Sequence, residues 1–213
     1  MYRIVQFSIL ILILALVGCQ TTGIHKADRT VRIMNKKFAK LKGAPDEITA
    51  VTTSLNALVK EGGDMRAEFK AFDKDVNNLI YLQDRFRKLK TDLNSSKSDL
   101  IGTWAESQFT INNDELRARS RERRSEVIAR FNEVNELVTE TKAVFDPWLQ
   151  EVIDIRTYLE SDLNPDGVAS IADMAPKVSK KAKPVRSKIA NLITELDKLS
   201  NEMTATWPSE SRD

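Results

Sequence analysis

The stretch VIARFNEVNELVTETKAVFDPWLQEVIDIRTYL, residues 127–159, decides the fold of this chain. Its apolar or small residues recur at alternating steps of four and three, a spacing that places them along one side of a helix. A sustained seven-residue repeat is typical of long helices that pack along one another. The stretch therefore predicts a long helix with one buried seam. That seam comprises Val127, Phe131, Val134, Val138, Thr141, Phe145, Trp148, Val152, Ile155 and Leu159.

Three further segments carry seams of the same kind, and this repetition predicts an all-α fold. No stretch alternates apolar and polar residues for long enough to indicate a strand. Short connections between long helices place neighbours antiparallel. We therefore expect an elongated antiparallel helical bundle, or coiled coil, of about four helical segments over residues 26–203, with a frayed tail at 204–213. The expected helices are about 26–61 with a break near 43–46, 64–111, 113–160 and 165–203.

The connections between these segments contain residues that begin helices. Asp64 in EGGD is suited to cap the second helix, because its carboxylate can accept from free backbone N–H groups. In INNDEL, Asn112 followed by Glu115 predicts a capping box. In DLNPDG, Asn164 is the predicted cap and Pro165 occupies the first helical position.

Four prolines fall inside the expected helices. Pro45 predicts the break near 43–46, and Pro147 predicts a kink in the third helix, because proline donates no backbone hydrogen bond and clashes with the preceding turn. Pro176 and Pro184 make the start of the last segment the least regular part of the expected bundle.

The start of the chain predicts a bacterial lipoprotein signal peptide. After Arg3, residues 4–17 are apolar except for Gln6 and Ser8, a run shorter than the roughly 20 residues that cross a bilayer. A charged start followed by a short apolar run and small residues is typical of a signal peptide. The following LVGC, residues 16–19, resembles the bacterial lipobox, in which the cysteine thiol is diacylated and the peptide is cut before it.

We therefore expect a signal peptide at 1–18, cleavage between Gly18 and Cys19, lipidation of Cys19 with palmitate or a similar acyl chain, and a short anchor and linker at 19–25. Gln20 stands where aspartate would retain such a lipoprotein in the inner membrane. The expected location is therefore the inner leaflet of the outer membrane, facing the periplasm, and surface exposure stays open. The alternative is a short signal anchor that happens to contain the chain's one cysteine.

Composition narrows the classes of partner and chemistry. A formal net charge of +2 with 30 % charged residues gives no excess of positive charge for nucleic acid. With one cysteine and one histidine, the chain lacks the residues for histidine or thiolate metal sites, and we expect no cofactor and no metal.

Two basic segments are candidate binding surfaces. LRARSRERR, residues 116–124, holds five arginines: Arg117, Arg119, Arg121, Arg123 and Arg124. The favoured interpretation is a solvated face paired with nearby glutamates, and the alternative is binding to phosphate groups of an anionic lipid surface. Residues 177–188 have the same favoured interpretation, with an anionic envelope polymer as the alternative partner.

Four motifs, taken in order, resemble those of a bacterial lipoprotein family described only as a domain of unknown function. They are GIHK at 23–26, GGD at 62–64, Trp104 followed by LRARS at 116–120, and LNPDGVASI at 163–171. The resemblance extends from Gly23 to about Leu199, and the chain departs from it at KGAPDE and at the prolines of the last segment. It implies a helical, coiled-coil-rich periplasmic lipoprotein and no known reaction.

The function expected from these features is a membrane-anchored periplasmic lipoprotein with a non-enzymatic structural or binding role in the cell envelope. Its expected partners are the membrane, through the lipid anchor, and another protein or a second copy through the helical seams. The alternative is an envelope enzyme, or an enzyme activator, whose site is made of scattered carboxylates.

Overall fold

The computed structural model describes residues 22–60 and 62–206, with side chains over 28–60 and 62–204. These residues form helices and turns and contain no strand, which confirms the predicted all-α helical bundle. The helices are α2 (Thr22–Ala39), α3 (Ala44–Leu58), α4 (Met65–Gln108), α5 (Asp114–Ser161), α6 (Pro165–Ser170) and α7 (Met174–Thr206).

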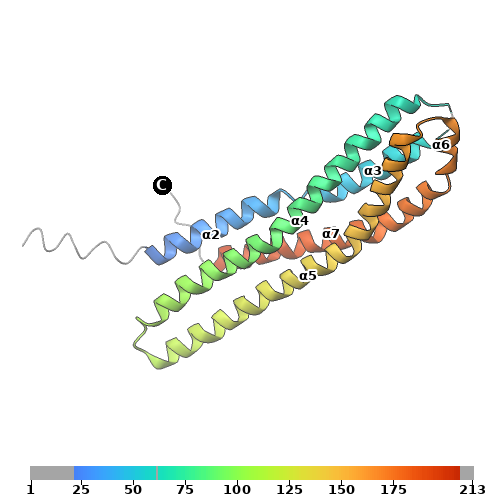
Figure 1. The fold of residues 1–213 in the computed structure, drawn as a ribbon. Coiled ribbons are helices and arrows are strands. Elements are labelled where there is room, and N and C mark those ends of the chain that lie inside the picture. Colours follow the sequence, from blue (N-terminus) through green and yellow to red (C-terminus); the bar gives the residue numbers. More distant parts are fainter. Residues whose placement is uncertain (1–21, 61, 207–213) are drawn as a thin grey trace, which may run out of the picture.

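The helices form four long rods that alternate in direction. In Figure 1, α2 and α3 together form the first rod, α4 and α5 form the second and third, and α7 returns as the fourth after the short α6. Polar side chains join each rod to the next and the last to the first. These pairs are Lys37 with Asp92, Asn94 with Asn135, Arg130 with Glu195, and Asn56 with Ser179.

The core lies along the shared axis of the rods, and the predicted seam of α5 is buried at each of its ten positions. Phe145 is at the centre of this packing, with its ring centroid 5.4 Å from that of Phe86 on α4 and 6.2 Å from that of Trp148. The Trp148 indole N–H donates to the backbone carbonyl of Val178 on α7 at 3.1 Å, so its one polar atom is satisfied inside the core.

The first rod breaks close to the predicted position. α2 ends at Ala39, residues 40–43 form a turn, and α3 begins at Ala44 with Pro45 in its first turn. A helix running through Pro45 would need the proline ring to occupy the space of the Leu41 carbonyl, and this clash ends the helix before it. The Leu41 carbonyl instead accepts from the backbone N–H of Ala44 at 2.9 Å.

Pro147 lies inside α5 without ending it. Figure 1 shows α5 changing direction in its last third, the part of the sequence that contains Pro147. The helix thereby bends toward α6 and keeps its seam against the core.

The helical segment expected over 165–203 is divided into two helices near Pro176. α6 ends at Ser170, residues 171–173 form a turn, and α7 begins at Met174. Pro176 is the physical reason, because a continuous helix would place its ring against the carbonyl of Ala172 and leave that carbonyl without its donor. A helix that begins at Met174 holds Pro176 in its first turn, where no backbone N–H is needed. Pro184 lies within α7, which continues through it.

Two of the three predicted caps are observed, and the third is shifted by one residue. Asp64 accepts from the backbone N–H groups of Arg66 and Ala67, and Asn164 accepts from that of Gly167. The prediction of Asn112 as a cap is wrong, because Asn113 caps α5 by accepting from Leu116.

The predicted signal peptide at 1–18, the Gly18–Cys19 cleavage position, Cys19 and Gln20 lie outside the described residues. Among the helices that the structure does describe, none has a segment long and apolar enough to span a bilayer.

Candidate functional site

The end of the hairpin formed by α4 and α5 contains the predicted arginine run. A turn over residues 109–113 joins the two helices, and we call residues 109–117 the hairpin tip. In Figure 1 the tip lies at the same end of the bundle as the start of α2, and the turn between α3 and α4 lies at the opposite end together with α6.

The position of the tip along the bundle follows from one ion pair. Lys37 of α2 donates to Asp92 of α4 at 2.5 Å. Antiparallel helices rise equally per residue, so fifteen residues back from Lys37 and fifteen forward from Asp92 bring Thr22 level with Ser107. Phe109 follows two residues later. The hairpin tip therefore lies at the level of the start of α2 and slightly beyond it.

Arg117 holds the turn in shape. Its guanidinium donates to the backbone carbonyl of Ile111 at 2.7 and 3.0 Å and to that of Asn112 at 3.4 Å. It also pairs with Asp114 at 2.9 Å. These bonds give hydrogen-bond donors to carbonyls that a tight turn would otherwise leave without partners. Arg117 is therefore a structural residue, which the sequence alone did not distinguish from the other four arginines.

A polar contact between the two helices lies just behind the tip. The indole N–H of Trp104 donates to the Ser120 hydroxyl at 2.9 Å, and the Gln108 amide donates to the same oxygen at 3.1 Å. Gln108 is buried. These two bonds tie the last turn of α4 to the first turns of α5, so the tip is fixed at its base as well as at its turn.

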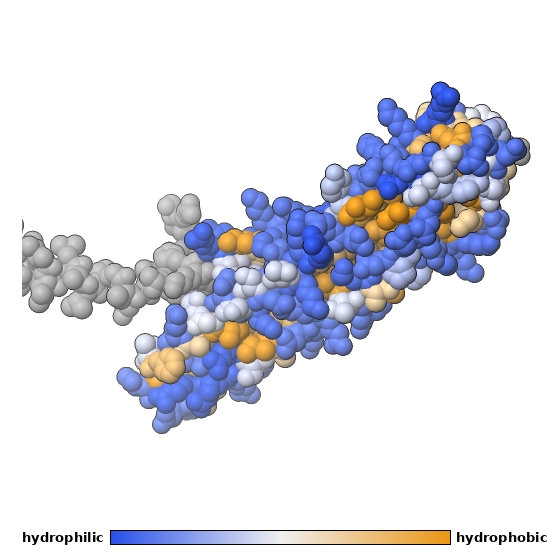
Figure 2. Space-filling model, in the orientation of Figure 1, coloured by the Kyte–Doolittle hydropathy of each residue, from blue (hydrophilic) through white to orange (hydrophobic). Residues whose placement is uncertain are grey.

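Two large apolar side chains project from this fixed tip. Phe109 is 89 % exposed, the highest value among the exposed large hydrophobic residues of the described chain, and Leu116 is 57 % exposed. Figure 2 shows apolar atoms at the end of the hairpin, surrounded by hydrophilic ones. Ile111 lies half-buried in the same turn. Sequence reasoning did not identify Phe109 and Leu116, although both stand off the heptad seam and flank a predicted turn.

The five arginines do not form one surface. At 100° per residue, Arg117, Arg121 and Arg124 lie on one side of α5, whereas Arg119 and Arg123 lie on the other. Arg119 pairs with Glu115 at 2.6 Å, and Arg123 pairs with Glu126 at 2.9 Å. The structure thus pairs two of the arginines with glutamates of their own helix.

The charge around the tip is nearly balanced. Between residues 109 and 126, the five arginines stand among four carboxylates. These are Asp114, Glu115, Glu122 and Glu126. A surface with so little net charge attracts an anionic membrane weakly, because opposite charges a few ångströms apart cancel beyond a Debye length of about 8 Å.

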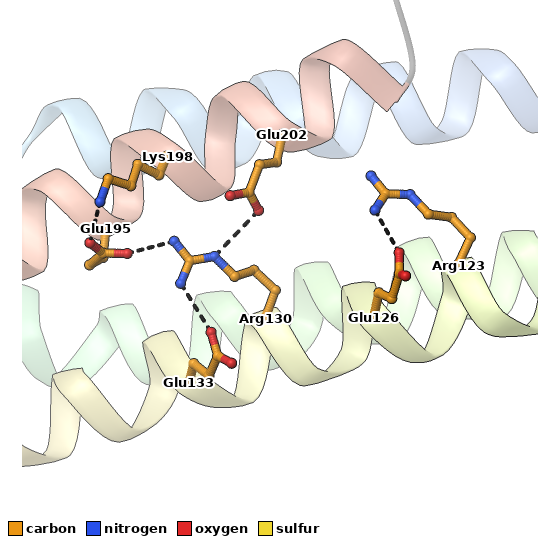
Figure 3. A network of polar contacts seen from close by, with 7 residues as sticks. All are labelled: Arg123, Glu126, Arg130, Glu133, Glu195, Lys198 and Glu202. Atoms are coloured by element: carbon orange, nitrogen blue, oxygen red, sulfur yellow. Dashed lines mark hydrogen bonds and ion pairs between the residues drawn. The ribbon is translucent and has the colours of Figure 1, made fainter.

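A second arginine network lies further along α5 and joins it to α7. Figure 3 shows Arg130 between three glutamates: it donates to Glu195 at 2.6 Å, to Glu133 at 3.1 Å and to Glu202 at 3.3 Å. Burial lowers the pKa of Arg130, but the hydrogen bonds to Glu195 and Glu133, together with the negative charges of Glu202 and Glu195, raise it above the ordinary value. Hydrogen bonds from Lys198 and Arg130 lower the pKa of Glu195.

The second predicted basic surface, residues 177–188, is partly neutralised. Three of its lysines form ion pairs with carboxylates, at distances between 2.6 and 2.7 Å. The pairs are Lys177 with Asp173, Lys181 with Glu151, and Lys188 with Glu140. Two of them join α7 to α5 and so hold neighbouring rods together.

A hollow of about 470 Å³ lies at the end of the bundle opposite the hairpin tip. It opens between the turn that precedes α4 and the short α6, with Val59, Met65 and Val168 in its wall and Glu68 as a charged residue. Hollows of this size, lined mainly by apolar side chains with a few polar groups, are the usual form of binding sites in proteins. In the described residues, no group of three or more His, Cys, Asp or Glu side chains is arranged to hold a metal ion.

Comparison with known proteins places the chain in one family. The sequence model of DUF2959, described as a protein of unknown function, matches residues 17–206, a range that contains Cys19 and all six described helices. No curated protein and no solved structure matches the chain. Because the match covers most of the sequence, the chain belongs to the DUF2959 family of proteins of unknown function.

Proposed function

We propose that this protein is a membrane-anchored lipoprotein of the bacterial cell envelope with a non-enzymatic structural or binding role. Acylated Cys19 holds one end of the helical bundle at the inner leaflet of the outer membrane, and the bundle extends into the periplasm. The observation that carries the proposal is the placement of the chain's one cysteine directly after an apolar run and directly before the bundle.

Covalent geometry supports an anchor close to the bundle. Cys19 precedes the first residue of α2, Thr22, by three residues. Three residues span at most about 11 Å, so acyl chains on Cys19 keep the end of the bundle within that distance of the lipid surface. The DUF2959 match also supports treating the cysteine and the helical bundle as one unit, because the match begins at residue 17 and so includes Cys19 together with the helices.

The acyl chains supply the binding energy. Each buried methylene contributes about 0.8 kcal/mol, and stable anchoring takes more than one chain. A diacylated cysteine with a further chain on its amine meets this requirement, so no helix has to cross the bilayer.

The length of the rods supports a role in spacing or presentation. α4 has 44 residues, so it extends about 66 Å at 1.5 Å per residue. The hollow beside α6 lies at the far end of this rod from the start of α2. The bundle would thus present its partner-binding end well away from the membrane that anchors it.

Metabolic labelling with palmitate tests the anchor. Cys19→Ala should carry no label and should be released from the outer membrane or mislocalised, because only the thiol can form the thioether. Thr21→Ala keeps the thiol and serves as the matched control, with labelling and fractionation unchanged. Palmitate on the Cys19→Ala protein would show that the lipobox interpretation is wrong.

Photo-crosslinking in intact cells tests the binding role. A photoreactive residue at Ala172, in the wall of the hollow, should capture a defined envelope partner or a second copy of the chain. The same residue at Gly102, on the surface of α4 with open space around it, is the control. Equal products at both positions would argue against the hollow as the contact.

A further inference from the structure

We propose that the hairpin tip is a second membrane contact, in which Phe109 and Leu116 enter the head-group region of the bilayer that holds the acyl chains of Cys19. This inference rests on the proposed function, because it requires Cys19 at a lipid surface. It assigns the contact to the apolar residues of the tip and not to the five arginines.

The exposure of Phe109 is built into the fold. The turn that carries it is held by the Arg117 guanidinium on the Ile111 and Asn112 carbonyls, and its base is held by the Trp104 and Gln108 bonds to Ser120. A phenylalanine on a loose loop could fold back over the helices. On a turn held at both ends it stays in the solvent, 89 % exposed, beside a 57 % exposed Leu116.

The level of the tip supports a lipid partner. Thr22 is level with Ser107, and Phe109 is two residues further along the same direction. Cys19 lies three residues before Thr22 in the sequence, a reach of at most about 11 Å, so acyl chains on Cys19 bring a bilayer close to the level of the hairpin tip. A bilayer that receives the acyl chains is therefore within reach of the exposed Phe109.

The small size of the tip also favours lipid over a protein partner. Stable protein interfaces bury about 800 Å² on each side, far more than two side chains provide. A lipid contact needs no such area here, because the anchor already holds the tip at the bilayer and makes its insertion an intramolecular step.

A single fluorescent label tests the contact in the acylated full-length chain. The chain has one cysteine, Cys19, and acylation blocks its thiol, so Phe109→Cys creates one labelling position. The protein is labelled there with an environment-sensitive fluorophore and reconstituted into vesicles of phosphatidylethanolamine and phosphatidylglycerol. Leu116→Cys gives a second tip position. Tyr81→Cys is the control, because Tyr81 is 70 % exposed in the middle of α4.

Labels at 109 and 116 should shift their emission to the blue and should lose intensity when the lipids carry nitroxide quenchers, whereas the label at 81 should do neither. Raising the salt concentration should leave the signal at 109 unchanged, because the contact is apolar. Equal responses at 109 and 81 would overturn the proposal. A blue shift at 109 without quenching by lipid nitroxides would overturn it in favour of a protein contact, such as a second copy of the chain.

A further variant tests the residue itself. Phe109→Ser should lower the equilibrium constant for insertion of the tip by about tenfold or more, because burial of a phenylalanine side chain away from water contributes about that factor. Lipid quenching of a label at position 116 reports the inserted fraction and should fall accordingly. The far-ultraviolet circular dichroism and melting temperature should stay unchanged, because the exposed Phe109 side chain is not part of the core and its removal leaves no cavity. Unchanged quenching at 116 would show that Phe109 contributes no contact.

The same preparation separates this inference from the proposed function. The wild-type chain should take up no label, because its only thiol is acylated. Labelling of Cys19 in the wild-type chain would contradict the lipoprotein proposal itself. An unlabelled wild type together with a solvent-exposed signal at 109 would leave the anchor standing and refute only the tip contact.

Discussion

Gly167 lies where the backbone of α6 comes against the end of α5. A Cβ added to Gly167 would stand 2.0 Å from the backbone carbonyl oxygen of Asp162, and that oxygen belongs to a chain segment with little freedom to move. The buried glycine lets the chain turn directly from α5 into α6. At the residue scale, the motif LNPDG therefore specifies a close approach as well as a helix cap.

Gly167→Ala should destabilise the bundle by about 1–3 kcal/mol, the usual cost of forcing extra volume into a packed position. Gly102→Ala is the matched control, because a Cβ at Gly102 meets nothing within 4 Å and the residue lies inside α4. That change should stabilise the helix by about 0.5–1 kcal/mol. Urea unfolding measures both, and equal effects of the two substitutions would contradict the close approach at Gly167.

Glu195 gives a pH-dependent prediction. Hydrogen bonds from Lys198 and Arg130 lower the pKa of its carboxyl in the folded protein. Its contribution to stability is therefore present above the unfolded-state pKa of about 4.3 and is lost as the pH falls through the lower folded-state pKa. Glu195→Gln should lower the melting temperature at pH 7, and the difference from the wild type should shrink toward pH 3.

Glu136→Gln is the control for this experiment. Glu136 is exposed on α5, and no ion pair in the described residues involves it. Its substitution should leave the melting temperature unchanged at both pH values. A Glu195→Gln deficit that persists undiminished at pH 3 would show that packing, and not the ionised carboxylate, is responsible.

At the scale of the element, α5 joins the core to both of its neighbours. Phe145 is fully buried between Phe86 of α4 and Trp148. Trp148 in turn bonds to the backbone of α7. One turn of α5 thus connects three of the four rods, immediately beside the proline that bends it.

Phe145→Ala should lower the free energy of unfolding by about 3–5 kcal/mol, the range for deleting a buried aromatic side chain and leaving a cavity. The adjacent Val144 is 37 % exposed, so Val144→Ala should cost less than about 1 kcal/mol. Denaturant unfolding of the two variants gives the comparison. Similar losses would mean that the core relaxes into the space left by Phe145.

The seams could be read from the sequence because a heptad repeat leaves little choice of buried face. The exact residues at which the helices begin and end could not be read in this way, because they depend on contacts with residues outside the heptad repeat. Asn112 and Asn113 are equally good caps by residue type. In the folded turn Asn113 accepts from Leu116, while Arg117 donates to the carbonyls of Ile111 and Asn112. The exposure of Phe109 also depends on that turn, and no repeat in the sequence predicts this exposure.

The same limit applies to the arginine run. The density of arginines in the sequence made one basic surface possible. Helical geometry instead divides them between two sides of α5, and Arg117 is hydrogen-bonded to the backbone of the turn. Charge density along a sequence predicts a surface only when the residues also share a face. The apolar tip was therefore found from exposure and position, which require the folded hairpin.

At the scale of the whole molecule, the proposed anchor sets the orientation of the bundle. The start of α2 and the hairpin tip lie at one end, and α6 lies at the other. If the acyl chains enter the outer membrane, the α6 end points into the periplasm. Under this proposal, Gln20 is the residue expected to determine which membrane holds the bundle.

Gln20→Asp should shift the protein from the outer-membrane fraction toward the inner-membrane fraction, because aspartate directly after the acylated cysteine favours retention. Gln20→Asn, which is similar in size to aspartate and uncharged, should keep the outer-membrane location. Density-gradient separation of the two membranes measures the distribution. Outer-membrane fractionation of the aspartate variant would show that this position is not the sorting signal.

Because the bundle has four rods that alternate in direction, the first rod begins and the last rod ends at the same end of the bundle. Ser200 of α7 donates to Asn35 of α2, so Thr206, six residues later, is level with Arg29, six residues earlier. The start of α2 and the end of α7 thus lie side by side at one end of the bundle, and the Gly62–Gly63 turn lies at the other end. A circular permutant that links α7 to α2 and opens the chain at that turn should retain every contact between neighbouring rods.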